Sequence, residues 1–373
     1  MKKIAILVPG GVGNADQKKN IPPLAALIDQ LSIKFDITVY SFVKVELPSA
    51  GTLAGNIEVR STDCNIHDSI IKRILLLTFA VLKDYRKKRF NIIHGVWAFP
   101  SGFVSVVQAK LLGIKSIISV LGGEAASVPQ IGYGNMLRPV LRMITLWSCN
   151  NCDNLVTLTK YQVDALRNFT LKRKQIHVIP FGADKEKFNR SINDLTPPIQ
   201  FLHVANLTEV KDQKTLLHTF KQIHKQIDCR LWIIGPDYLE GEIQAFAKEL
   251  AINDQVQFLG HVLHERLPEY YAKSHIMIHT SYYEGQGFVI AEAAASGVVI
   301  CGTRVGLIAD LGEDRTISVE VGHYKELAQK VLNLLQDKKR FEKLRLNAKE
   351  WANKHNMDWT VSQYTQVYEK MFK

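Results

Sequence analysis

The chain has 373 residues, of which 46% are hydrophobic and 22% are charged. These fractions are typical of globular proteins and exclude a mostly disordered chain, a collagen-like repeat and a small disulfide-stapled scaffold. The 47 basic residues exceed the 36 acidic ones, and the net charge of +11 favours anionic partners such as phosphates, nucleic acid or an anionic membrane surface. Five cysteines, a sparse and odd number, favour a reducing compartment.

The N-terminus resembles the start of a signal peptide only briefly. Pro9-Gly10-Gly11 ends the apolar run Ile4–Val8 after five residues, whereas a secretory signal needs ~7–15. The longest apolar stretch, Ile74–Leu82, has nine residues, against the ~20 that a membrane-spanning helix needs. We therefore predict a cytoplasmic protein and assign residues 4–8 to a first buried strand.

Short apolar strands alternate with amphipathic helices through the first half of the chain. After the first strand, a helix rich in Leu and Ala follows Pro22-Pro23, and further strands are expected at residues 37–42, 91–94, 116–120, 155–158 and 176–179. This alternation predicts a mostly parallel sheet covered on both faces.

The same pattern restarts after Thr196-Pro197-Pro198, which is typical of a linker. Strands are expected at residues 201–206, 231–234, 256–259, 276–279 and 298–301. Two α/β units of similar size predict two Rossmann-like domains facing across a ligand-binding cleft. The tail from Tyr324 is helical in pattern, with a break near residues 353–358 before a last helix whose apolar face holds Trp359, Tyr364, Val367, Tyr368 and Phe372.

Several familiar motifs are incomplete or missing. Gly10-Gly11-Val12-Gly13 follows the first strand, but Asp16 stands where a dinucleotide fingerprint needs Gly or Ala. The chain contains no P-loop and no Asp-x-Asp pair, and it has no homeodomain, zinc-finger or RRM signature. Cys149-Asn-Asn-Cys152 has no second CxxC, so two half-buried thiols at a helix end are expected rather than zinc ligands. We predict neither a metal site nor a nucleic-acid partner.

A helix over residues 70–89 allows two interpretations. Its apolar residues precede the basic cluster Arg86–Arg89. Such a helix can lie on an anionic bilayer, or it can dock on the sheet with its basic end complementing the helix dipole. We favour docking for the apolar part and leave the role of the basic end open.

The richest constellation is the block from Ser281 to Ala294. Glu284 follows an apolar strand and precedes Gly285 and Gly287, and Glu292 lies within the helix that begins near Gly287. The start of a helix after a glycine turn offers free N–H groups to a diphosphate. The two carboxylates are placed to accept hydrogen bonds from sugar and ribose hydroxyls.

This block resembles the E-G-x-G-x-x-x-x-E signature of the retaining GT-B glycosyltransferases of family 4, the "group 1" class. The resemblance covers almost the whole chain. The other stretches that resemble family motifs, in the family's order, are Gly10-Gly11, residues 178–188, residues 202–217 with Lys211, residues 258–262 and residues 319–327.

The resemblance implies a GT-B fold, with a C-terminal helix crossing back to the first domain, and a metal-independent, retaining hexosyltransferase. The implied domains are residues 1–190 on the acceptor side, 191–355 for the donor and 356–373 for the crossing helix. The implied co-substrate is a nucleotide diphosphate sugar, most simply a UDP- or GDP-sugar, with no further cofactor.

The resemblance also implies roles for individual residues. Lys211 would neutralise the diphosphate leaving group, and Glu284 would contact the transferred sugar. Glu292 would bind the ribose, and the backbone near His261 would meet the base. The remaining implied donor contacts are Gly10, Gly11, Asn206, Gly287, Phe288 and Val289; the candidate acceptor or sugar contacts are His94, Gly123 and Glu124.

Three positions depart from the family pattern. Asn206 stands where Arg is usual, which removes a positive charge unless Arg304 or Lys214 replaces it. Leu121 stands where His is usual, and Gly306-Leu307 replaces a pair of glycines. These departures keep two alternatives open: a nucleotide-sugar-binding partner subunit with weak or no catalysis, and another GT-B enzyme such as a nucleotide-sugar epimerase.

The acceptor is expected to be a glycan or lipid-linked glycan of cell-surface polysaccharide biosynthesis. The basic helix end Arg86–Arg89 suggests an anionic membrane surface as a further partner. We therefore expect a cytoplasmic protein that is peripheral at the inner membrane face.

Overall fold

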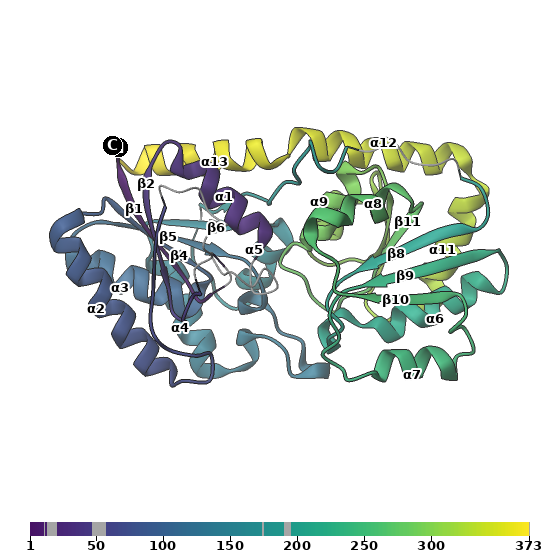
Figure 1. Ribbon diagram of the computed structural model, residues 1–373, viewed down its shortest axis with the longest axis horizontal. Helices are drawn as coiled ribbons and strands as arrows, with labels where there is room; N and C mark the ends of the chain where they lie inside the picture. The colour runs from purple at the N-terminus through teal and green to yellow at the C-terminus, as the bar shows by residue number, and fades with distance from the viewer. Residues whose placement is uncertain (11, 13–20, 47–56, 174, 190–194, 373) are drawn as a thin grey trace. The chain divides into compact units, whose positions relative to one another are not determined.

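A computed structural model describes residues 1–10, 12, 21–46, 57–173, 175–189 and 195–372. The chain forms two compact units. The first contains residues 1–127, 134–180 and 358–373, and the second contains residues 128–133 and 181–357. Each unit is built on its own parallel sheet (Figure 1).

The first unit has a seven-stranded sheet in the order β3-β2-β1-β4-β5-β6-β7, in which every neighbouring pair is parallel. β1 lies between β2 and β4. The strands that follow β3 are therefore added on the other side of β1, as in doubly wound folds. The strands are β1 (Lys3–Val8), β2 (Asp36–Ser41), β3 (Glu58–Ser61), β4 (Ile92–Val96), β5 (Lys115–Val120), β6 (Asn154–Thr157) and β7 (His177–Val178).

Helices cover both faces of this sheet. Successive side chains of a strand point to opposite faces, and β4 shows the consequence. Ile93 packs in an apolar cluster with α2 and α3, whereas His94 reaches α13. The helices of the first unit are α1 (Pro22–Ser32), α2 (Ile70–Lys88), α3 (Phe103–Leu112), α4 (Pro139–Asn151), α5 (Lys160–Arg167) and α13 (Met357–Met371), whose first residue belongs to the second unit.

The second unit has a six-stranded parallel sheet in the order β10-β9-β8-β11-β12-β13. Two buried apolar clusters lie on its faces, one with α6, α7 and α11 and the other with α9, α10 and α12. The strands are β8 (Ile199–Val204), β9 (Cys229–Ile234), β10 (Val256–Gly260), β11 (Ile276–His279), β12 (Val299–Thr303) and β13 (Thr316–Val319). The helices are α6 (Gln213–His224), α7 (Glu242–Glu249), α8 (Leu267–Ala272), α9 (Phe288–Ala295), α10 (Gly306–Leu311), α11 (Tyr324–Gln336) and α12 (Lys338–Lys354).

The C-terminal helix packs on the first sheet, as the sequence predicts. The hydroxyl of Tyr368 lies 2.7 Å from Nδ1 of His94, and the hydroxyl of Tyr364 lies 2.9 Å from Oγ of Ser119. Tyr368 also packs edge-on against Phe35. α12 instead belongs to the second unit, and the predicted break between the two helices falls at residues 355–356.

Gly182 lies where the chain leaves the first unit and passes the break between α12 and α13. A Cβ at Gly182 would come within 2.2 Å of the His355 carbonyl oxygen. Only glycine therefore fits this crossing, where the Met357 N–H donates to the Ala183 carbonyl.

One expectation is corrected, and another holds for only part of a helix. Cys149 and Cys152 are fully buried rather than half-buried, because they lie at the end of α4 under its packing on the rest of the unit. α2 does dock on the sheet, but it buries only Leu77 and Val81 completely and leaves several large apolar residues exposed. Among the residues that the structure describes, none of the helices has the length and apolarity that crossing a bilayer requires.

Candidate active site

The candidate site forms at the carboxyl edge of the second sheet. β8 and β11 are parallel neighbours, paired through Phe201 with Ile276 and Leu202 with Met277. Loops that follow adjacent parallel strands emerge at the same edge of a sheet. The loop after β8 carries Lys211, and the loop after β11 carries Glu284.

Lys211 and Glu284 form an ion pair. Nζ of Lys211 lies 2.5 Å from Oε1 of Glu284. The side chain of Glu284 is 10% exposed and that of Lys211 is 22% exposed. The pair is therefore partly shielded from water, and a charged hydrogen bond in such a place is stronger than on an open surface.

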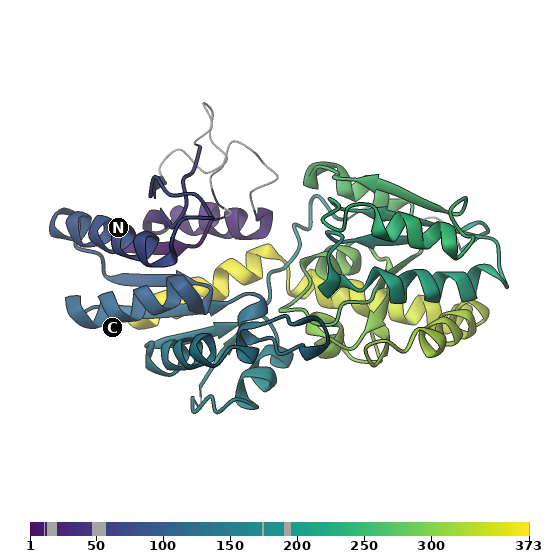
Figure 2. The same cartoon turned by 90° about the horizontal axis from the view of Figure 1, so that it is seen from below.

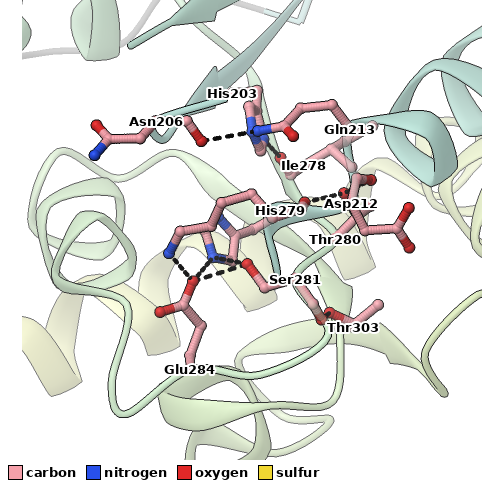
Figure 3. A network of polar contacts seen from close by, with 11 residues as sticks. His203, Asn206, Asp212, Gln213, Ile278, His279, Thr280, Ser281, Glu284 and Thr303 are labelled. Carbon is pink, nitrogen blue, oxygen red and sulfur yellow. Dashed lines mark hydrogen bonds and ion pairs between the residues drawn. The ribbon is translucent and has the colours of Figure 1, made fainter. Parts of the chain in front are cut away.

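Two further donors complete the cluster around Glu284. Nε2 of His279, the last residue of β11, lies 2.8 Å from Oε1, and Oγ of Ser281 also lies 2.8 Å from it. Lys211, His279 and Ser281 thus share one carboxylate oxygen, and Figure 3 shows the second oxygen pointing away from them. We name these four residues the Glu284 cluster.

The electrostatics keep Glu284 ionised. Burial opposes its charge, but the charge of Lys211 and the hydrogen bonds from His279 and Lys211 outweigh burial, so the pKa lies well below its usual range. A carboxylate oxygen only accepts hydrogen bonds, so Nε2 of His279 carries the proton. Nδ1 of His279 is buried without a hydrogen-bond partner in the described structure.

A second histidine packs against the cluster. The ring of His203 stacks on that of His279, with 5.8 Å between ring centroids, and its Nδ1 lies 2.9 Å from the Ile278 carbonyl oxygen (Figure 3). Burial lowers the pKa of His203 to about 3, so this ring is neutral. A neutral ring at His203 packs against His279 and adds no positive charge of its own beside Lys211.

The loop after β11 is tied to its surroundings on several sides. Thr280 donates to the Asp212 carbonyl at 2.9 Å, and Thr303 of β12 donates to the Ser281 carbonyl at 2.7 Å. The buried amide of Gln286 makes two hydrogen bonds to the backbone of Phe181. These contacts fix Glu284 relative to Lys211.

Glycines make the tight packing of this loop feasible. Gly306 has φ +53°, and a Cβ there would lie 2.6 Å from Cβ of Glu284. Gly287 has φ +78° and caps α9, which starts at Phe288 and continues through Val289. The first N–H groups of α9 follow Glu284 by only a few residues, as a diphosphate site at a helix start requires.

Glu292 is already engaged by two side chains that the sequence did not indicate. Its Oε1 lies 2.8 Å from Nε2 of His264, and its Oε2 accepts from the hydroxyl of Tyr271 at 2.9 Å. Each oxygen retains a second lone pair for a further donor. His261 is exposed just after β10, at the same edge of the sheet.

Among the described residues, neither Lys214 nor Arg304, the two candidates to replace the missing arginine, pairs with Glu284. The side chain of Asn206 is exposed and points away from the Glu284 cluster (Figure 3). Lys214 pairs with Glu242 at 2.5 Å, and Arg304 lies 3.5 Å from Glu320. Each of the two cations therefore already has an acidic partner.

The first unit contains further residues that the sequence indicated as donor or acceptor contacts. Gly10 follows β1 with φ +154°, whereas Gly11 lies outside the described residues. His94 is buried, and its two ring nitrogens contact Tyr368 and Ser119. Burial lowers its pKa to about 3. These contacts are those of a residue that ties α13 to the sheet.

Glu124 is buried and organises its own loop. Its carboxylate accepts from the N–H groups of Leu121 at 3.0 Å and Gly122 at 2.9 Å. Gly123 begins the short 3-10 turn that contains Glu124. In the described part of the chain, His, Cys, Asp and Glu residues form no group of three or more suited to a metal ion.

Comparisons with known proteins match this architecture. Residues 184–351 match the family described as glycosyl transferases group 1, and residues 32–187 match that described as glycosyltransferase family 4. N-acetyl-alpha-D-glucosaminyl L-malate synthase of Bacillus anthracis is 25% identical over 79% of this chain and 78% of its own. The N-acetylgalactosamine-N,N'-diacetylbacillosaminyl-diphospho-undecaprenol 4-alpha-N-acetylgalactosaminyltransferase of Campylobacter jejuni is 23% identical over 91% of this chain and 92% of its own.

Solved structures share the fold at low sequence identity. Sucrose-phosphate synthase of Thermosynechococcus elongatus aligns with a TM-score of 0.84 and 18% identity, over 100% of this chain and 99% of its own. HepE of Anabaena, solved with UDP-glucose, aligns with a TM-score of 0.76 and 15% identity, over 99% of this chain and 100% of its own.

Two parallel Rossmann-like sheets with a C-terminal helix on the first make up the GT-B fold. The two matches, which together span residues 32–351, show that the chain belongs to the group 1, or family 4, glycosyltransferases. It is a nucleotide-sugar-dependent enzyme of a retaining family.

Proposed function

We propose that the Glu284 cluster is the sugar-diphosphate end of a donor site that takes a UDP- or GDP-sugar. The observation that carries this proposal is the buried ion pair of Lys211 and Glu284 at the carboxyl edge of β8 and β11, immediately before the start of α9. One cation, one oriented carboxylate and a helix N-terminus are the groups that a sugar diphosphate requires.

Charge development during transfer explains the pairing. Negative charge grows on the diphosphate as the bond from the sugar to the phosphate breaks, and the Lys211 ammonium together with the N–H groups of Phe288 and Val289 stabilises it. Glu284 holds Lys211 in place before the donor arrives. Its second oxygen points away from Lys211 and accepts from a sugar hydroxyl.

We place the nucleoside end of the nucleotide sugar at the same edge of the sheet. Glu292 accepts from ribose hydroxyls through its remaining lone pairs, oriented by His264 and Tyr271. The backbone near His261 meets the base. Gly287 allows the close approach of the chain to the diphosphate.

For the acceptor we propose a glycan or lipid-linked glycan in cell-surface polysaccharide assembly, at the inner face of the membrane. The Campylobacter jejuni relative, whose name includes a diphospho-undecaprenol acceptor, supports a lipid-linked acceptor. The Bacillus anthracis relative, whose name includes L-malate, supports a range of acceptors among the relatives of this chain.

The exposed Asn206 favours a second candidate function, a nucleotide-sugar-binding subunit with little transfer activity. One cation fewer at the diphosphate weakens stabilisation of the leaving group. The two candidates share the donor site and differ in turnover.

Thermal unfolding with UDP, GDP, ADP, dTDP, CMP and NAD tests the donor site. A ligand at ~100 times its dissociation constant adds about 2.7 kcal/mol, which raises Tm by several degrees. A selective shift with UDP or GDP is expected. The absence of a shift with every nucleoside diphosphate would contradict the proposal. A shift without release of the nucleotide from the matching sugar donor would favour the binding subunit.

A further inference from the structure

Three helices of the first unit form one solvent-facing layer. α3 contacts both α2 and α4, and the three lie side by side on one side of the first sheet (Figures 1 and 2). We name their exposed side the three-helix face. Because the whole face belongs to the first unit, its properties do not depend on the donor site.

Large exposed apolar residues concentrate on this face. The three helices contain 42 of the 373 residues. Among the described residues, they nevertheless carry eight of the fourteen large apolar side chains that are exposed: Ile71, Leu75, Leu76, Phe79, Leu111, Val140, Met143 and Trp147. Single exposed apolar residues are ordinary in soluble proteins, but such a concentration marks an interaction surface.

The exposed stripe of α2 changes from apolar to basic along the helix. Residues four apart lie on one side of a helix, and here that stripe runs Ile71, Leu75, Phe79, Lys83 and Lys87. Leu75 is 64% exposed and Phe79 is 68% exposed. Three apolar side chains therefore project outward, followed by two lysines at the C-terminal end.

α4 repeats the arrangement with a shorter stripe. Val140, Met143 and Trp147 are exposed at spacings of three and four residues. Trp147 packs against Phe103 of α3, and Nζ of Lys110 lies 5.9 Å from the centre of its ring. A tryptophan beside a lysine at the edge of an apolar stripe is typical of a membrane interface.

The charge of these helices is strongly one-sided. The basic residues of the three are Lys72, Arg73, Lys83, Arg86, Lys87, Lys88, Lys110 and Arg142. Their one acidic residue, Asp84, accepts from the Tyr40 hydroxyl at 2.8 Å and pairs with Arg60. Lys72 and Lys88 pair with carboxylates outside these helices, Asp68 and Glu58. The remaining basic residues still give the face an excess of positive charge.

We propose that the three-helix face docks on an anionic lipid bilayer. Apolar side chains enter the boundary between headgroups and acyl chains, while the surrounding lysines and arginines contact lipid phosphates. A bilayer suits this surface better than an acidic protein does, because the apolar side chains project from two helices and need no matching pocket. Docking would bring the first unit to a membrane, where a lipid-linked acceptor resides.

Vesicle co-sedimentation of the full chain tests the proposal. One set of vesicles is phosphatidylcholine with phosphatidylglycerol, and the other is phosphatidylcholine alone. The wild type is expected to bind the anionic vesicles preferentially at low salt. Lys83→Glu with Lys87→Glu is expected to weaken that binding by at least about tenfold, and Leu75→Gln with Phe79→Gln by a similar factor.

Matched controls come from the second unit. Lys338→Glu with Lys339→Glu reverses two exposed lysines, and Tyr238→Gln with Leu346→Gln removes two apolar side chains that are 64% and 58% exposed. Both controls are expected to retain binding, and circular dichroism checks that all variants are folded. Nucleotide-induced shifts in Tm are measured on the same samples, so a failed donor site is distinguished from failed docking.

Three results would overturn the proposal. They are equal binding to both vesicle types, no binding to either, and equal losses in the face variants and their controls. Binding to polyglutamate without binding to anionic vesicles would also overturn it, and would point to an acidic protein as the partner of this face.

Discussion

At the residue scale, the Glu284 cluster gathers Lys211 and two further donors, His279 and Ser281, on a single oxygen. An acceptor shared among three donors is fixed in orientation, because rotation of the carboxylate would break all three contacts together. His279 is the hydrogen-bond donor of this cluster that the family motif did not indicate. We propose that His279 positions Glu284 and does not itself contact the nucleotide sugar.

Replacing His279 with Leu is expected to lower the rate of sugar transfer. The lost hydrogen bond to a carboxylate accounts for about 10- to 100-fold in rate. His279→Gln retains a donor and should recover part of the loss. Steady-state kinetics are expected to show the change in kcat, with a smaller change in KM for the donor. Equal activity in the Leu variant and the wild type would contradict the positioning role.

Glu284 also predicts a pH dependence of stability. Burial opposes its ionisation, but Lys211 and His279 outweigh burial and hold its pKa below the ordinary 4.5. Its contribution is therefore present above pH 4.5 and lost as the pH falls toward the lower folded pKa. The difference in free energy of unfolding between wild type and Glu284→Gln should shrink by about 1.4 kcal/mol for each pH unit below 4.5. Urea unfolding from pH 6 to about pH 3 measures it, and a constant difference would contradict the prediction.

At the element scale, the loop after β11 depends on the start of α10. The Leu307 N–H donates to the Gln286 carbonyl at 2.8 Å, and Gly306 leaves room for Glu284 beside it. The sequence showed Gly306-Leu307 as a departure from a pair of glycines. The structure shows that the first of these two positions is the one packed against the loop.

Gly306→Ala is expected to lower the free energy of unfolding by more than the same substitution at a glycine that has open space around it. The new Cβ would lie 2.6 Å from Cβ of Glu284 and 2.7 Å from the Gln286 carbonyl oxygen. Gly241→Ala is the matched control, because Gly241 also has a positive φ of 88° but no heavy atom within 4 Å. We expect the control to cost about 1 kcal/mol and Gly306→Ala to cost about 1–3 kcal/mol more. Equal losses in denaturant unfolding would contradict this account of the loop.

At the scale of the whole molecule, the last helix belongs to the first unit although it is farthest from that unit in sequence. Removing residues 358–373 takes away Tyr364 and Tyr368 and leaves buried His94 and Ser119 without these partners. Hydrogen exchange is expected to show lost protection in β4 and β5, whereas β8 and β11 remain protected. Unchanged protection in β4 and β5 would contradict the assignment of α13 to the first unit.

Much of the fold could be predicted because buried parallel strands are continuous apolar runs. β3 was missed because it is an edge strand whose residues, Glu58 to Ser61, are exposed or half-buried and mostly polar. β13 was missed because Thr316–Val319 is only four residues long and half polar. Neither segment has the apolar pattern that identified the other strands.

A residue of the candidate site could be predicted only where it lies in a stretch that resembles a family motif. Glu284 and Lys211 follow strands and match family motifs, so the sequence indicated them. His279 was predicted only as the last residue of an apolar strand and was given no role in the site, although a polar residue at that end was a usable signal. His264 and Tyr271 were missed because they precede Glu292 by 28 and 21 residues, and only the fold brings them together.

The central claim is that Lys211 and Glu284 form the donor site. Calorimetric titration of the nucleoside diphosphate that most stabilises the wild type tests it most directly, in Lys211→Met and Lys214→Met. Lys214 is the matched control, because it lies three residues away and pairs with Glu242 rather than Glu284. We predict at least about tenfold weaker binding in Lys211→Met, from loss of a charged contact to phosphate, and unchanged binding in Lys214→Met. Equal affinity in the folded Lys211→Met variant and the wild type would contradict the claim.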